Sequence, residues 1–159
     1  MSICYQWQAR FCDMTSKAEY NDGYTFILTC IDCFSKYAWA IPIMSKRGEE
    51  IVQAFKRILK MSGRKPKRLQ TDKGKEFLNT KVQSFLRENG IQLFTTESDK
   101  KASIVERFNR TTKGRTYKYF TVNNTYRYEE VLRSLVGGYN NTYHRSIKMK
   151  PIAVRIGKR

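Results

Sequence analysis

The chain has 159 residues, of which 40% are hydrophobic and 13% aromatic, and this favours one folded domain over a disordered chain or two domains. Its 31 lysine and arginine residues exceed its 14 acidic residues and give a net charge of +17, which favours a polyanionic partner such as nucleic acid. No apolar run approaches the roughly 20 residues of a membrane-spanning helix, and no signal-peptide pattern opens the chain, so we expect an intracellular protein without a membrane partner.

The N-terminal part of the chain has the pattern of three strands. Apolar and polar side chains alternate over residues 5–13, which is the period of a half-buried strand. Residues 24–32 and 37–43 are rich in β-branched and aromatic side chains. Asn21-Asp22-Gly23 marks a turn before the second segment, because asparagine and glycine accept positive φ at little cost. We therefore expect a three-stranded antiparallel meander.

The four cysteines, at positions 4, 12, 30 and 33, all fall near the N-terminus. Cys30 and Cys33 have the spacing of a zinc or redox pair, but no second pair and no nearby histidine accompanies them. The alternative is a set of buried or half-buried thiols in a reducing compartment, and we favour it. We predict no zinc site.

Helices alternate with two short strands in the rest of the chain. Glu49 to Lys60 carries the apolar stripe of an amphipathic helix, which Gly63 and Pro66 close. The segments predicted after it are a strand at 67–71, a helix at 78–88 that ends at Asn89-Gly90, a strand at 91–95, helices at 103–120 and 127–140, and a short helix that Pro151 opens. The order βββαβαβααα predicts a single α/β domain over residues 1–159.

Two carboxylates stand at places where predicted elements end or begin. Asp72 ends the strand in Leu69-Gln70-Thr71-Asp72, and Glu106 lies near the start of helix 103–120. A strand end and a helix start can pack a few ångströms apart, and carboxylate oxygens there suit a hard cation of the kind that phosphodiester-cleaving enzymes use. The structural alternatives are a turn aspartate before Lys73-Gly74 and a glutamate that complements the helix dipole and pairs with Arg110.

Several motifs, in this order, resemble those of the retroviral-type integrase catalytic core, a DDE-superfamily domain with a ribonuclease-H-like fold. They are Trp7-Gln8-Ala9, Ile31-Asp32-Cys33-Phe34-Ser35-Lys36-Tyr37, Gln70-Thr71-Asp72-Lys73-Gly74-Lys75-Glu76-Phe77, Val105-Glu106-Arg107-Phe108-Asn109-Arg110-Thr111, and a tail of residues 139–146 with Pro151. The resemblance covers the whole chain and is closest to integrases of Polinton/Maverick-type DNA transposons. It implies a five-stranded mixed sheet, with a three-strand antiparallel meander plus two strands, flanked by helices.

The resemblance also implies a chemistry, which is 3′-end processing and strand transfer during DNA integration. In this family three carboxylates hold two Mg²⁺ or Mn²⁺ ions, which activate a water or a DNA 3′-hydroxyl for in-line attack on a phosphodiester. Asp72 and Glu106 match the second and third carboxylates and would be both catalytic residues and metal ligands.

The position of the first carboxylate holds Arg10, because the family pattern after Trp7-Gln8 is one residue and then aspartate. An arginine cannot ligate a metal, and its positive charge repels one. Asp13 is a possible substitute, although residues at odd offsets in a strand face opposite ways. We expect Arg10 to pair with Asp72 or Glu106 and to impair catalysis. The alternatives are an active metal-dependent polynucleotidyl transferase that uses Asp13, a register in which Arg10 is an edge-strand residue on a solvated face, or a captured non-catalytic module for DNA binding or dimerisation.

One face of the predicted helix 103–120 carries the expected DNA-binding residues. These residues are Asn109, Arg110, Lys113, Tyr117 and Lys118, and Arg115 widens the basic surface. The resemblance assigns contact with DNA ends to Arg110 and Lys113, four and seven residues beyond Glu106. Basic side chains there would bind phosphates with salt-dependent and largely sequence-independent affinity. A merely solvated basic face is the alternative.

The remaining expectations concern partners and location. Arg64-Lys65-Pro66-Lys67-Arg68 suits phosphate binding or nuclear import, and residues 97–102 have the polar composition of a substrate-side loop. We expect DNA and a second copy of the chain as partners, because integrase cores pair through helices, and a nuclear location. The family's usual N-terminal zinc module and C-terminal DNA- or chromatin-binding module are not expected within this sequence.

Overall fold

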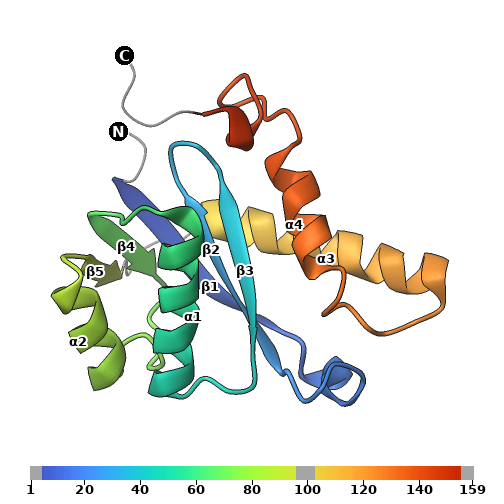
Figure 1. The fold of residues 1–159 in the computed structure, drawn as a ribbon, viewed down its shortest axis with the longest axis horizontal. Coiled ribbons are helices and arrows are strands. Elements are labelled where there is room, and N and C mark those ends of the chain that lie inside the picture. The colour runs from blue at the N-terminus through green and yellow to red at the C-terminus, as the bar shows by residue number, and fades with distance from the viewer. Residues whose placement is uncertain (1–4, 96–102, 155–159) are drawn as a thin grey trace.

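The structure is a computed structural model and describes residues 5–95 and 103–154, which form one mixed sheet with helices on both faces (Figure 1). The strands are β1 (Gln6–Asp13), β2 (Phe26–Asp32), β3 (Ala38–Ile43), β4 (Arg68–Thr71) and β5 (Gln92–Thr95). The helices are α1 (Gly48–Ser62), α2 (Thr80–Glu88), α3 (Ser103–Asn123) and α4 (Leu132–Asn140), with short 3₁₀ helices η1 (Thr15–Tyr20) and η2 (Pro151–Ala153). Among these helices none is both long and apolar enough to cross a membrane.

The sheet has the strand order β3-β2-β1-β4-β5. β1, β2 and β3 pair antiparallel, whereas β4 pairs in parallel with both β1 and β5. The predicted meander and the five-stranded mixed sheet are therefore confirmed. β1 lies at the centre, so side chains on it can reach elements packed on either face.

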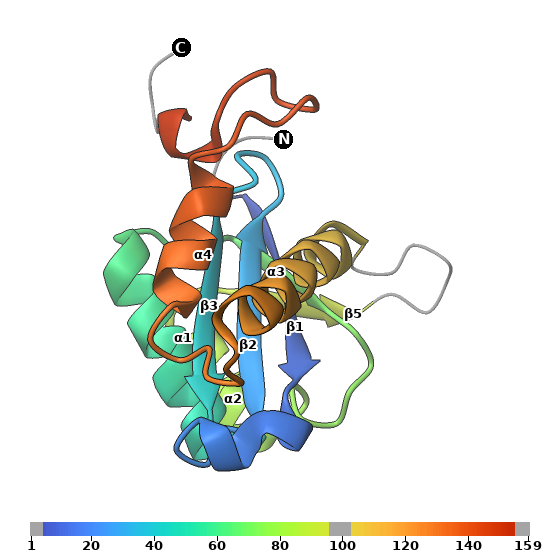
Figure 2. The same cartoon turned by 90° about the vertical axis from the view of Figure 1, so that its right-hand side faces the viewer.

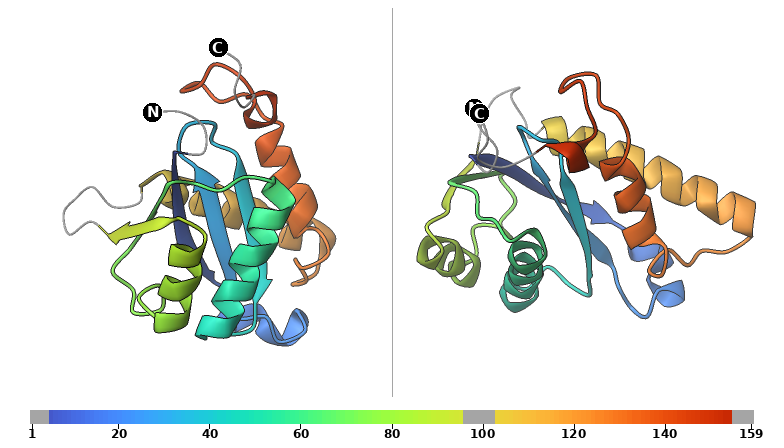
Figure 3. Two further views of the ribbon diagram at one scale, coloured as in Figure 1. Left: turned by 60° about the vertical axis from the view of Figure 1, so that its left-hand side comes forward. Right: turned by 45° about the horizontal axis from the view of Figure 1, so that its top comes forward.

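Each face of the sheet carries its own hydrophobic core. α1 and α2 cover one face, and α3 and α4 cover the other (Figures 1 and 3). The first core includes Trp7, Leu28, Phe55 and Leu86, and the second includes Ile27, Ile31, Val105, Phe108, Leu132 and Val136. Neighbouring residues of β2 enter opposite cores, as the alternation of side chains in a strand requires.

The same alternation decides where the polar residues of β1 point. Trp7 and Ala9 belong to the core beneath α1 and α2. Gln8 and Arg10 therefore project from the other face, which α3 crosses (Figure 2). The arginine thus lies beneath the helix that carries Glu106.

Two features depart from the sequence-based expectation. η1 has no strong periodic signal and was not predicted, and α4 begins at Leu132 rather than at residue 127. The side chain of Asn21, which is fully buried, donates from Nδ2 to the Tyr126 carbonyl at 2.9 Å and accepts from the Tyr128 backbone N–H at 2.9 Å. These bonds hold the backbone of Tyr126 and Tyr128 against Asn21, and the helix starts later, at Leu132. The expected substrate-side loop at 97–102 lies outside the described residues.

Candidate functional site

The loop that follows β4 fixes the Asp72 carboxylate. Asp72 Oδ1 accepts a hydrogen bond from the Gly74 backbone N–H at 3.0 Å. A Cβ atom at position 74 would lie 2.9 Å from Asp72 Oδ1 and 2.5 Å from Glu76 Oε2, closer than carbon and oxygen normally approach. A larger residue at position 74 would therefore require the Asp72 and Glu76 carboxylates to shift.

The start of α3 is docked on the sheet by buried glutamines. Gln8 Oε1 accepts hydrogen bonds from the backbone N–H groups of Ile104 and Val105, both at 3.0 Å. Gln8 Nε2 donates to Gln70 Oε1 at 3.0 Å, and Gln6 Nε2 donates to the same oxygen at 3.1 Å. These bonds satisfy first-turn N–H groups that a helix cannot satisfy itself, and they place Glu106 above β1 and β4.

Arg10 joins the two carboxylates that the sequence singles out. Its Nη1 forms an ion pair with Glu106 Oε1, and its Nε lies 4.0 Å from Asp72 Oδ2. All three side chains are partly exposed, at 32%, 42% and 33% for Arg10, Asp72 and Glu106. The predicted ion pair between Arg10 and the carboxylates is confirmed, and it is formed with both of them.

Other carboxylates near β1 have partners of their own. Asp13 Oδ1 accepts from the Thr15 backbone N–H at 2.9 Å and from Thr15 Oγ1 at 2.6 Å, and these bonds lower the pKa of Asp13. Phe11 packs against the core beneath α1, so alternation places Asp13 on that side of the sheet, away from the Arg10 side chain. Asp32 is fully buried and accepts from Trp7 Nε1 at 3.1 Å and from the Phe34 backbone N–H at 2.8 Å. Over residues 5–95 and 103–154, no three His, Cys, Asp or Glu side chains are grouped so as to hold a metal ion.

Four of the five predicted DNA-binding residues occupy the outer surface of α3. Arg110, Lys113, Tyr117 and Lys118 are exposed, whereas the inner positions Val105, Phe108, Thr112, Thr116 and Phe120 are buried. Asn109 is half-buried, and within the described part of the chain its Oδ1 is buried without a hydrogen-bond partner. Lys113 Nζ lies 5.9 Å from the centre of the Tyr117 ring. The shared face expected from the helical spacing is therefore present.

The basic cluster at 64–68 is divided by contacts with aromatic rings. The Arg64 guanidinium lies 5.5 Å from the Tyr37 ring centre and 5.9 Å from that of Trp39, and the Arg68 guanidinium lies 4.0 Å above Phe94. Lys65 and Lys67 are exposed. Two of the four basic side chains in this cluster, Arg64 and Arg68, therefore contact aromatic rings of the protein.

The cysteines within the described ranges are free thiols. Cys30 and Cys33 are buried, and burial raises the pKa of Cys33 to about 12. Cys4 lies outside the described residues.

Sequence reasoning missed the positioning role of Gln6, Gln8 and Gln70. A glutamine in a strand gives no periodic signal, and it is usually exposed. Gln8 and Gln70 are each only 5% exposed. One feature of the sequence does indicate a buried Gln8: it is next to the core residue Trp7 in a strand that helices cover on both faces.

Comparison with known proteins gives relatives for most of the chain. Residues 6–101 match the family described as "Integrase core domain". A putative uncharacterized transposon-derived protein of Caenorhabditis elegans is 42% identical over 137 residues, which are 86% of this chain and 48% of that protein. The Transposon Ty1-DR4 Gag-Pol polyprotein of Saccharomyces cerevisiae is 30% identical over 97 residues, which are 57% of this chain and 6% of the polyprotein. The chain thus spans about half of the worm protein and a small part of the yeast one.

Solved structures share the fold at low sequence identity. The HTLV-2 integrase catalytic core domain, in complex with magnesium and in a trimeric form, superposes with a TM-score of 0.78 at 19% identity, and the match covers 96% of both chains. A chain of the simian T-cell lymphotropic virus intasome, in complex with PP2A regulatory subunit B56 gamma, gives a TM-score of 0.86 at 18% identity, covering 99% of this chain and 56% of that one. These neighbours establish the ribonuclease-H-like architecture.

The glutamine junction generates a stability prediction. Replacing Gln8 with leucine keeps the side-chain volume but leaves the Ile104 and Val105 N–H groups without their acceptor, so the free energy of unfolding should fall by about 1–3 kcal/mol. Urea titration followed by circular dichroism measures this change. Gln92→Leu, on the exposed face of β5, is the control and should change stability by no more than about 0.5 kcal/mol. Equal effects of the two substitutions would contradict the role given to Gln8.

Proposed function

The chain belongs to the integrase core domain family, and from this premise we propose that it is a DNA-binding integrase or transposase core whose own strand-transfer chemistry is blocked by Arg10. The observation that carries the proposal is the guanidinium of Arg10, which contacts both Glu106 and Asp72. The elements that would position a DNA-joining site are all present. The positive charge that contacts both carboxylates belongs to a side chain of the protein and not to a metal ion.

The residues present do not fit a two-metal site. Two carboxylates remain, and Arg10 already pairs with both. Two unit charges 4 Å apart near a protein surface interact by about 4 kcal/mol, so a divalent ion near the guanidinium would meet strong repulsion. Removing Arg10 would leave Asp72 and Glu106 facing each other without a cation between them. The arginine therefore stabilises the site in the absence of metal.

DNA binding does not depend on those carboxylates. Arg110 and Lys113 are exposed on α3, beyond Glu106, and are free to reach phosphates outside the ion pair. A rigid helix that carries such cations engages the DNA backbone without reading its sequence. Arg10 pairs with both carboxylates, so no metal ion is needed to reduce their repulsion of DNA phosphates. We therefore expect duplex affinity to be independent of Mg²⁺. Asn109, Tyr117 and Lys118 would extend the same contact surface.

A second copy of the chain is the partner we propose for the groove beside β3. This groove of about 900 Å³ runs between α1 and α4 over β3, which is an edge strand of the sheet. Its walls carry Arg57, Lys60 and Arg133 together with Glu129 and Glu130, which also pair with Arg127 of the same chain. Charges of both signs on one surface can pair with themselves across a two-fold axis. The HTLV-2 core, which shares the fold, is described in dimeric and trimeric forms.

The location of the protein and its origin are proposed from its membership of the integrase core family. A DNA partner supports a nuclear location, and exposed Lys65 and Lys67 are available to an import receptor. Similarity to a transposon-derived protein of C. elegans supports a mobile-element origin. Within that origin, we retain the Polinton/Maverick type as the proposed subgroup.

Substitution of Arg10 tests the blocked site. The native chain should give no Mg²⁺- or Mn²⁺-dependent strand transfer with a labelled DNA end, and calorimetry should detect no Mn²⁺ binding. Arg10→Asp supplies the missing carboxylate, so this variant should bind Mn²⁺ and form strand-transfer product, and adding Asp72→Asn should abolish both. If the native chain itself cuts DNA and Asp72→Asn stops it, the blocked-site proposal is wrong, and Asp13→Asn then tests the substitute ligand.

The basic face of α3 is tested by the salt dependence of duplex binding. Arg110→Ala with Lys113→Ala should weaken binding and lower the slope of log K against log salt by about 2, because roughly one counterion is released for each phosphate contact. Fluorescence anisotropy over a series of salt concentrations gives the slope. The matched control is Lys81→Ala with Arg87→Ala on α2, which should leave the slope unchanged. An unchanged slope for the α3 variant would remove this helix from the interface.

The proposed dimer is tested by sedimentation. The native chain should sediment as a dimer, and Ala40→Glu should shift it to monomer, because the new carboxylate would stand in the groove on β3. Met44→Glu adds the same charge just beyond β3, at a residue that is 50% exposed and outside the groove, and should remain dimeric. A native chain that is monomeric throughout, or two variants that behave alike, would contradict the assignment.

A further inference from the structure

We propose that exposed tyrosines at the C-terminal end of α3 form a stacking surface for an unpaired DNA strand. This aromatic platform consists of Tyr117, Phe120, Tyr126 and Tyr20. Tyr117 and Phe120 lie in α3, Tyr126 follows that helix, and Tyr20 ends η1. The inference rests on the proposed function only in the choice of DNA as the polyanion.

The four rings form a continuous series. The ring centres of Tyr117 and Phe120 are 5.4 Å apart, those of Phe120 and Tyr126 are 5.8 Å apart, and those of Tyr126 and Tyr20 are 5.0 Å apart. Lys113 Nζ lies 5.9 Å from the Tyr117 ring centre, so the series continues from the basic face of α3. At the other end, Lys17 Nζ lies 4.1 Å from the centre of the Tyr126 ring.

The exposure of the rings distinguishes a binding surface from internal packing. Tyr117, Tyr20 and Tyr126 are 39%, 41% and 48% exposed, whereas Phe120, which links them, is 5% exposed. Contacts that served only to fasten η1 to α3 would gain most by burying the rings. Exposed aromatic rings accompanied by lysines are the composition that binds single strands, where bases stack on rings and cations bind phosphates.

The polar network beneath the platform holds its rings in place. Asn21 donates from Nδ2 to the carbonyls of Lys17 and Tyr126, both at 2.9 Å, and Arg127 Nη1 donates to the Tyr20 carbonyl at 2.8 Å. Asn21 and Tyr128 are fully buried. The backbone on both sides of the Tyr20–Tyr126 contact is thus fixed before any ligand arrives, which lowers the entropic cost of binding.

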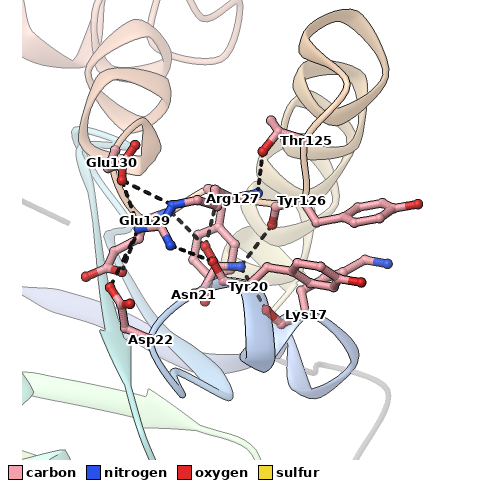
Figure 4. A network of polar contacts seen from close by, with 10 residues as sticks. Lys17, Tyr20, Asn21, Asp22, Thr125, Tyr126, Arg127, Glu129 and Glu130 are labelled. Atoms are coloured by element: carbon pink, nitrogen blue, oxygen red, sulfur yellow. Dashed lines mark hydrogen bonds and ion pairs between the residues drawn. The ribbon is translucent and has the colours of Figure 1, made fainter.

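Three acidic side chains near this network lie away from the exposed rings. Figure 4 shows Tyr20, Tyr126 and Lys17 extending to one side, while Asp22, Glu129 and Glu130 lie on the other side around Arg127. Arg127 Nη2 lies 2.8 Å from Glu130 Oε1 and 3.6 Å from Asp22 Oδ2, so these acids already have a cation. Glu19, next to Tyr20, raises the pKa of the Tyr20 hydroxyl and leaves it protonated. Glu19 is therefore an acidic residue beside the rings, at the Tyr20 end of the platform.

An unpaired strand is the ligand that such a surface selects. In a duplex the base faces are stacked on one another and only the terminal pairs expose them, so the rings gain little from double-stranded DNA. A frayed end or a displaced strand offers its bases freely. The basic face of α3 and the aromatic platform would then hold the duplex and unpaired parts of one DNA molecule.

The test compares binding of an oligothymidylate of about 20 nucleotides with binding of a duplex of the same length by fluorescence anisotropy of the 159-residue chain. Tyr20→Ala with Tyr126→Ala should weaken oligothymidylate binding by at least about fivefold and change duplex binding by less than about twofold. Tyr126→Phe keeps the ring and should bind the oligothymidylate as the native chain does. Tyr143→Ala removes a tyrosine that is 61% exposed in the C-terminal loop and should also have no effect.

Several results would overturn the proposal. These are failure of the native chain to bind the oligothymidylate, equal losses for single-stranded and duplex DNA, and tighter binding of an oligouridylate of the same length. If the alanine variant unfolds, Tyr126→Leu replaces it in the comparison of oligothymidylate with duplex binding. Leucine keeps the apolar contact with Phe120 but lacks a stacking face. Loss of duplex binding in the Arg110→Ala and Lys113→Ala variant tests the proposed function separately, because that result does not depend on the platform.

Discussion

The hydrogen bonds of the Gln8 side chain are the interactions on which the arrangement of this fold depends most. One amide joins three elements, because its oxygen accepts from the first turn of α3 and its nitrogen donates to Gln70 on β4, while its backbone belongs to β1. Arg10, Asp72 and Glu106 come from these same three elements or their ends. A shift of α3 by one residue would break both bonds to Gln8 and carry Glu106 away from the strand.

The framework and the chemistry of the site are therefore separable. The glutamine junction uses hydrogen bonds that require no metal, so α3 can stay in place whichever residue occupies position 10. The ion pair of Arg10 with Glu106 and Asp72 then satisfies charges that the framework brings together in any case. Such a chain can lose a reaction while it keeps its shape, its basic helix face and its surfaces for other molecules.

Patterns of side-chain spacing predicted most of this architecture. Alternation identified β1, β-branched and aromatic composition identified β2 and β3, and an apolar stripe identified α1. The motif positions of Asp72 and Glu106 led to the ion pair with Arg10. The late start of α4 could not be predicted, since it depends on Asn21, which is distant in sequence and takes the Tyr126 carbonyl. The glutamine junction and the aromatic platform were missed for the same reason. The junction and the platform each combine residues from segments that are distant in sequence. No single segment shows a polarity pattern that predicts the contact, because only the fold brings these residues together.

The Arg10 ion pair also restricts how this lineage can change. Every aspartate codon differs from every arginine codon at more than one base, so an aspartate cannot arise at position 10 in one mutational step. An intermediate such as glycine would leave Asp72 and Glu106 close together without the cation that now pairs with both, and like charges at short range destabilise a fold. A change from arginine to aspartate by this route would therefore pass through a less stable protein, and selection for stability alone would preserve the arginine.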